Sequence, residues 1–116
     1  MTATVGDFAR LAGPAISLVE EGTLHPATLP NGSRLCVGRF EGVLFAVKDH
    51  CPHAEFPLSE GSLLPNGEIE CGWHGARFDC RSGAVRRGPA EDALVTYEIE
   101  VRGDALFARR APRSGS

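Results

Sequence analysis

The sequence predicts an all-β protein, because short strand-like segments alternate with turn-forming residues along its length. The 116 residues include 14 glycines and 8 prolines, which divide the chain into segments too short for ordinary helices. Near the end, apolar residues alternate with polar ones, with the period of two of a half-buried strand. These apolar residues are Val95, Tyr97, Ile99 and Val101. At most one helical turn is expected, in residues 16–21.

The predicted strands follow one another closely and are separated by glycine-containing turns. Asn31-Gly32 and Asn66-Gly67 are hairpin signals, because both residue types tolerate the positive φ that such turns need. The predicted strands are residues 7–12, 23–29, 34–40, 43–47, 68–70, 77–79, 94–101 and 105–108. The earlier ones form a meander that leads directly into a Cys-Pro-His motif at residue 51.

Length and charge narrow the possible functions. A chain of 116 residues is one domain, and a net charge of −3 argues against a nucleic-acid binder, which would carry a basic patch. No window approaches the roughly 18 apolar residues of a membrane span. The N-terminus lacks the charged and apolar regions of a signal peptide. We therefore expect a soluble, cytoplasmic protein that binds neither nucleic acid nor membrane.

Two Cys/His pairs are the clearest candidate for a metal site. Cys51 and His53 form the first pair, Cys71 and His74 form the second, and residues 54–70 lie between them. Thiolates and imidazoles are ligands for zinc and for iron–sulfur clusters. A Cys₂His₂ zinc site generally groups Cys with Cys and His with His. Here each loop supplies one of each, which suits a two-iron cluster that both loops straddle.

The two remaining cysteines are expected to be free thiols. With no export signal, a reducing compartment is expected, where disulfides are rare. Neither Cys36 nor Cys80 has a His nearby in the sequence. We therefore expect each to be a small buried side chain and not a ligand.

The two pairs resemble the signature of the Rieske [2Fe–2S] family, which is C-x-H, a spacer of this order, and then C-x-x-H. The residues around them agree, with Pro-Leu-Ser-Glu-Gly at 57–61 and His-Gly-Ala-Arg-Phe-Asp at 74–79. The resemblance implies a Rieske-like antiparallel β-sandwich with a small cluster-binding subdomain formed by two loops. It also implies one [2Fe–2S] cluster, with Cys51 and Cys71 on one iron and His53 and His74 on the other.

The resemblance divides the chain into an N-terminal extension, a domain and a tail. Residues 1–6 would be the extension, and residues 7–108 the Rieske domain. The cluster-binding subdomain would span about 49–88. Residues 109–116, rich in Arg, Pro, Ser and Gly, are expected to be a disordered tail.

Non-ligand positions favour a low reduction potential. Respiratory-type members carry a disulfide where this chain has Phe56 and Trp73, and Ser and Tyr hydroxyls where it has Ala76 and Phe78. Hydrogen bonds to sulfur stabilise the extra electron, so their loss lowers the potential. We therefore expect the lower part of the roughly −150 to +300 mV Rieske range.

Other residues around the cluster allow two interpretations. Phe56 and Trp73 would form an apolar lid over it, or only pack in a core. Gly75 directly follows the second pair. Pro89 fits a loop that shields the cluster in the family, or an ordinary turn before the next strand.

The resemblance implies a ferredoxin of a multicomponent dioxygenase, such as an aromatic ring-hydroxylating one. The chain would act as a monomer, carrying one electron from a flavin-dependent ferredoxin reductase to a terminal oxygenase. It would not be an enzyme by itself, because only His25 and His50 remain for a mononuclear iron site. One alternative is a small subunit of a larger reductase, such as assimilatory nitrite reductase. Another is a structural zinc module.

Overall fold

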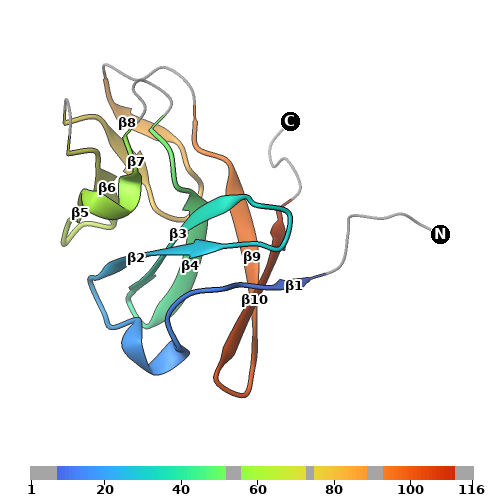
Figure 1. Ribbon diagram of the computed structural model, residues 1–116. Coiled ribbons are helices and arrows are strands. Elements are labelled where there is room, and N and C mark those ends of the chain that lie inside the picture. Colours follow the sequence, from blue (N-terminus) through green and yellow to red (C-terminus); the bar gives the residue numbers. More distant parts are fainter. Residues whose placement is uncertain (1–7, 52–55, 73–74, 89–92, 112–116) are drawn as a thin grey trace.

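The computed structural model describes residues 8–51, 56–72, 75–88 and 93–111, and almost all of their regular structure is antiparallel β-sheet (Figure 1). Two short 3₁₀ turns, η1 (Ile16–Leu18) and η2 (Leu58–Glu60), interrupt the strands. The prediction of an all-β protein is therefore confirmed. The strands are β1 (Ala9–Arg10), β2 (Leu24–Thr28), β3 (Arg34–Phe40), β4 (Val43–Lys48), β5 (Ser62–Leu63), β6 (Glu68–Glu70), β7 (Arg77–Asp79), β8 (Val85–Arg87), β9 (Thr96–Arg102) and β10 (Ala105–Arg110).

The larger sheet has six strands in the order β1-β10-β9-β4-β3-β2, and it curls until its two edges meet. The meeting point is a bridge between Ala12, just past β1, and Thr28 at the end of β2. Two backbone hydrogen bonds of 2.8 and 2.9 Å join these residues. Because the edges satisfy each other there, part of this sheet is protected from pairing with another chain.

The smaller sheet has four strands in the order β5-β6-β7-β8, and it lies in the chain between two neighbouring strands of the larger sheet. The chain leaves the larger sheet after β4 and returns to it at β9, which pairs with β4. The N–H of Lys48 donates to the carbonyl of Val95 at 2.8 Å, at the point where the two segments meet. Figure 1 shows β5–β8 gathered as a separate layer beside the larger sheet.

Strand β3 separates two apolar cores, because its successive side chains point to opposite faces. Leu35 and Val37 lie in the core enclosed by the curled sheet, whereas Cys36 lies in the core between the two sheets. All three are fully buried. The core between the sheets consists of Cys36, Phe45, Val47, Cys51, Leu58, Ile69, Cys71, Ala76, Phe78, Cys80 and Leu94.

One predicted boundary was wrong. Strand β10 continues through Arg109 and Arg110, although residues from 109 onward were expected to be disordered. The Nε of Arg109 donates to Glu98 on the paired strand at 2.7 Å, and its guanidinium lies 4.3 Å from the centre of the Phe8 ring. These contacts order two arginines that composition alone assigns to a tail. Residues 112–116 lie outside the described part.

Gly61 marks a close approach of two backbones in the smaller layer. It ends η2 and immediately precedes β5, which pairs with β6. A Cβ atom at this position would overlap the carbonyl oxygen of Glu70. Glycine is therefore required here for lack of space and not for its φ, which is negative.

Neither helical turn of the described chain is long or apolar enough to span a lipid bilayer.

Replacing Gly61 by Ala should destabilise the protein by roughly 1–3 kcal/mol, because the backbone of Glu70 must shift to admit the methyl group. Thermal unfolding followed by far-ultraviolet circular dichroism measures the loss. Gly88→Ala is the matched control, since nothing lies within 4 Å of a Cβ there. The control should stay within about 0.5 kcal/mol of the wild type. Equal effects of the two substitutions would contradict the close approach.

Candidate metal centre

Two loops carry the predicted ligands, and each begins where a strand ends. Cys51 lies three residues beyond β4 of the larger sheet, and Cys71 directly follows β6 of the smaller sheet. Both are buried, with exposures of 0% and 1%, and both belong to the core between the sheets. The structure thus places the two predicted thiolate ligands in one core. The predicted ligands His53 and His74 lie outside the described residues.

Each loop is closed at its base by the same kind of backbone hydrogen bond. The N–H of Cys51 donates to the carbonyl of Phe56 at 3.0 Å, and the N–H of Cys71 donates to the carbonyl of Ala76 at 2.8 Å. Donor and acceptor are five positions apart in both loops. The two closed loops are therefore matched in length. In sequence, each contains one cysteine and one histidine that are predicted ligands.

The second loop turns at Gly75, and the first loop packs against it. Gly75 has a φ of +74°, which favours glycine, and its N–H donates to the carbonyl of Cys71 at 3.1 Å. The ring of Phe56 lies close to Gly72, where a Cβ atom would be only 3.2 Å from Cε1 of the ring. Phe56 is partly buried against the core between the sheets. It therefore connects the two loops.

A buried carboxylate ties the first loop to the turn that follows it. Asp49 is 7% exposed and accepts two hydrogen bonds of 2.7 Å from Ser59, one from the backbone N–H and one from the hydroxyl. The N–H of Asp49 in turn donates to the carbonyl of Arg34 on β3 at 2.9 Å. Hydrogen bonds to a carboxylate are among the stronger ones in proteins. Asp49 therefore holds η2 and the first loop on the larger sheet.

The two positions that were expected to lack hydrogen-bond donors are both fully buried. Ala76 and Phe78 have exposures of 0% and belong to the same core as Cys51 and Cys71. Phe78 on β7 pairs with Ile69 on β6, two residues before Cys71. Neither side chain has a polar hydrogen. The environment that they give to the second loop is therefore apolar.

Cys36 and Cys80 are buried free thiols, as predicted. Burial raises the pKa of the Cys36 thiol far above its usual range, and the nearby charge of Asp49 raises it further. Burial also raises the pKa of Cys80 to about 11, with a further contribution from Asp79. Both thiols are therefore protonated and unreactive at neutral pH.

Two arginines in the second half of the chain are occupied by ion pairs. Nε of Arg77 lies 3.1 Å from Oε2 of Glu70, its partner across β6 and β7. Arg86 on β8 lies 3.1 Å from Asp79. Both pairs are partly exposed, so each contributes little to stability.

His25, which is distant in sequence from the predicted ligands, has a local partner. Its Nε2 lies 3.0 Å from the hydroxyl oxygen of Thr23, and its side chain is partly buried. The imidazole of His25 therefore has a hydrogen-bonding partner outside the two loops.

Some predicted neighbours of the cluster remain predictions. Trp73 and Pro89 lie outside the described residues, as do His53 and His74. Within the described stretches, no three Cys, His, Asp or Glu side chains are gathered closely enough to hold a metal ion. The two buried cysteines nevertheless fit a metal cluster, because a positive metal centre stabilises the thiolate, so that a coordinating thiol loses its proton even in an apolar site.

The supporting role of Asp49 and Ser59 was missed from the sequence. The residues are ten positions apart and form no recognised motif, so local patterns could not connect them. The only available signal was an acidic residue immediately before His50-Cys51, at the end of a predicted strand. A buried acidic residue generally has partners, but its burial could not be read from the sequence.

Comparison with protein families gives one match that spans most of the chain. The model of the Rieske [2Fe-2S] domain matches residues 14–98. This range contains both loops, both Cys/His pairs and all of the smaller sheet.

Named relatives and solved structures agree with this match. The ferredoxin component of the p-cumate 2,3-dioxygenase system of Pseudomonas putida is 38% identical over 89 residues, covering 77% of this chain and 75% of the relative. A ferredoxin solved in "Complex of reduced oxygenase and oxidized ferredoxin in carbazole 1,9a-dioxygenase" superposes with a TM-score of 0.78 at 29% identity, covering 87% and 93% of the two chains. A putative NADH-dependent nitrite reductase small subunit from Mycobacterium tuberculosis has a TM-score of 0.73 at 17% identity, covering 91% and 98%, which shows a shared fold only.

Replacing Asp49 by Ala should lower the free energy of unfolding by roughly 1–3 kcal/mol, because the partly buried N–H and hydroxyl of Ser59 lose their acceptor. Ser59→Ala removes only the hydroxyl hydrogen bond and should have a smaller effect, of about 0.5–1.5 kcal/mol. Urea unfolding followed by circular dichroism compares the two. An effect of Ser59→Ala as large as that of Asp49→Ala would show that the backbone bond contributes nothing.

Proposed function

This chain belongs to the Rieske [2Fe-2S] domain family, and on that premise we propose that it is the one-electron carrier of a multicomponent oxygenase. The observation that carries the proposal is the pair of matched loops, each closed at a buried cysteine. A named relative that covers three quarters of the chain is the ferredoxin component of a dioxygenase system. Such a component transfers electrons and is not itself the oxygenase.

In this proposal, the four ligands come in pairs from the two loops. Cys51 and Cys71 hold one iron of the cluster, and His53 and His74 hold the other. The burial of both cysteines in one core supports the first assignment, and the position of each His within a closed loop in the sequence supports the second. The cluster supplies a site that accepts and releases one electron. The protein supplies the two loops and the buried apolar side chains on which they rest.

The apolar side chains beside the second loop favour a low reduction potential. Ala76 and Phe78 are fully buried beside the second loop and offer no side-chain hydrogen bond to a sulfur atom. Without such a bond, the reduced cluster is less stabilised, and the potential falls toward the lower part of the Rieske range.

The proposed partners are a flavin-dependent ferredoxin reductase, which reduces the cluster, and a terminal oxygenase, which oxidises it. A structural neighbour that was solved with its oxygenase supports the second partner. We propose that the chain works in the cytoplasm as a monomer, because a carrier must leave one partner before it meets the next. The role of a nitrite reductase small subunit has less support, because that likeness extends only to the fold.

The anaerobically purified protein should contain about two irons and about two acid-labile sulfides per chain. Added to a flavin-dependent ferredoxin reductase and the terminal oxygenase of an aromatic dioxygenase system, it should make NADH oxidation depend on the oxygenase substrate. Iron, sulfide and product formation are measured together. Cys36→Ser is the control, because that buried thiol is not a proposed ligand and its replacement should leave the iron content unchanged.

Two results would contradict this function. One zinc per chain without sulfide would make the chain a structural zinc module. A protein that contains the cluster, accepts electrons and does not support turnover with these components would be a Rieske protein of another system.

Replacing Phe78 by Tyr should raise the reduction potential by roughly 40 mV. The estimate assumes a new hydrogen bond to sulfur of about 1 kcal/mol, with 59 mV for each factor of ten in a one-electron equilibrium. Potentiometric titration followed by visible circular dichroism measures the shift. Phe107→Tyr is the matched control, because Phe107 lies on β10 of the larger sheet, against the guanidinium of Arg102, and does not belong to the core that contains both cysteines. A potential that does not change in Phe78→Tyr would mean that the hydroxyl does not reach a sulfur atom.

A further inference from the structure

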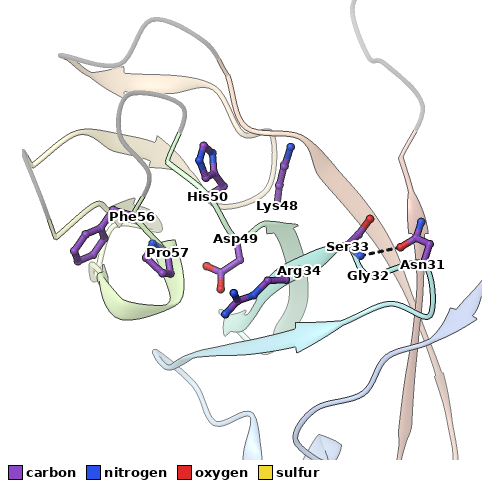
Figure 2. A pocket seen from close by; sticks show the side chains of 9 residues that line it. All are labelled: Asn31, Gly32, Ser33, Arg34, Lys48, Asp49, His50, Phe56 and Pro57. Atoms are coloured by element: carbon purple, nitrogen blue, oxygen red, sulfur yellow. Dashed lines mark hydrogen bonds between the residues drawn. The ribbon is translucent and has the colours of Figure 1, made fainter.

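A groove of about 580 Å³ lies beside the base of the first loop (Figure 2). The turn between β2 and β3 forms one side of it, and Phe56 and Pro57 form the opposite side. Between these sides lie the start of β3 and the end of β4, which bring Arg34 and Lys48 into the same groove. The antiparallel register pairs Lys48 with Leu35, the residue next to Arg34.

The exposed charges in this groove are all positive. Arg34 and Lys48 are exposed, and neither forms an ion pair with any residue in the described part of the chain. Asp49 also borders the groove, but it is buried and its carboxylate oxygens accept hydrogen bonds from Ser59. Five other arginines are held in ion pairs, namely Arg77, Arg81, Arg86, Arg102 and Arg109. Arg10, Arg87 and Arg110 are exposed without an ion pair to the described residues, but they do not line this groove.

The groove therefore differs in charge from the chain as a whole, which carries −3. Two exposed cations without partners attract anionic groups, and the surrounding negative charge of the protein does not favour the same groups elsewhere. His50 adds an imidazole to the same lining.

The groove also adjoins the backbone that holds a proposed ligand. Phe56, in its wall, provides the carbonyl that closes the first loop by accepting a hydrogen bond from Cys51. His50, which also lines the groove, directly precedes Cys51. A protein segment seated here would thus contact the loop from both of its ends.

We propose that this groove is the docking site for an acidic segment of the redox partner, which carries an apolar side chain among its carboxylates. Its carboxylates pair with Arg34 and Lys48, and its apolar side chain packs on Phe56 and Pro57. The inference rests on the proposed function in taking the partner to be a redox protein. Charged pairs at the rim of such a contact mainly raise the association rate and make it sensitive to salt.

A fluorescein-labelled polyglutamate peptide is the binding probe, measured by fluorescence anisotropy on the cluster-containing protein at low ionic strength. The wild type should bind it, and Lys48→Glu or Arg34→Glu should weaken binding by roughly fivefold or more through like-charge repulsion. Lys48→Arg should retain binding because it keeps the charge. Arg10→Glu is the matched control, because Arg10 is exposed on β1, does not line the groove and changes the net charge equally.

The control decides the interpretation of this experiment. If Arg10→Glu weakens peptide binding as much as Lys48→Glu does, the attraction comes from the net charge of the protein, and the groove proposal is overturned. It is also overturned if the wild type fails to bind at low ionic strength. Visible circular dichroism of each variant confirms that the cluster and its loops are intact before binding is measured.

A kinetic measurement relates the groove to the path of the electron. Chemically reduced protein is mixed in a stopped-flow instrument with ferricyanide, which is an anion, or with tris(phenanthroline)cobalt(III), which is a cation. Lys48→Glu should slow oxidation by the anion several-fold and accelerate oxidation by the cation, whereas Arg10→Glu should change either rate by less than about twofold. If Lys48→Glu and Arg10→Glu are oxidised at equal rates, the groove does not lie near the route by which the electron leaves the cluster.

These results are independent of the proposed carrier function. Peptide binding requires no electron transfer to an oxygenase, so it can be positive in a protein that fails to support turnover. Conversely, turnover that is normal in both Lys48→Glu and Arg10→Glu would leave the carrier function standing and overturn the docking site.

Discussion

The two backbone hydrogen bonds that close the loops, from Cys51 to Phe56 and from Cys71 to Ala76, are the constraint on which the candidate site depends. In both, the donor is the N–H of the cysteine itself. Loop closure and the position of the thiol are therefore set at a single residue. The two closures have the same length, although one loop follows a strand of the larger sheet and the other follows a strand of the smaller sheet.

Those closures are effective because the loops rest on a core with little freedom. The side chains of β3 and β4 are buried on both faces of the strand pair, one face toward the curled sheet and the other toward the smaller sheet. Asp49 adds a polar connection between the same strand pair and η2. Movement of the first loop would therefore disturb packing, a buried carboxylate and sheet hydrogen bonds together.

Much of this fold and site could be predicted from the sequence, and the failures have physical causes. The segments 34–40, 68–70 and 77–79 were predicted with the observed ends, because turn residues border each of them. Strand β8 was missed, because Val85–Arg87 has no alternating pattern and becomes a strand only by pairing with β7. The groove was missed for a related reason: Arg34 and Lys48 are far apart in sequence, and only the register of β3 and β4 brings them together.

The hydrogen bond between Lys48 and Val95 marks the place where the chain leaves the larger sheet and returns to it. The segment between them, which contains the smaller sheet and both loops, begins and ends at adjacent points on neighbouring strands. Its two chain ends thus lie next to each other, although its side chains also share a core with β3 and β4. Because of this arrangement, loops of the segment that lie outside the shared core can change in length while β4 and β9 remain paired.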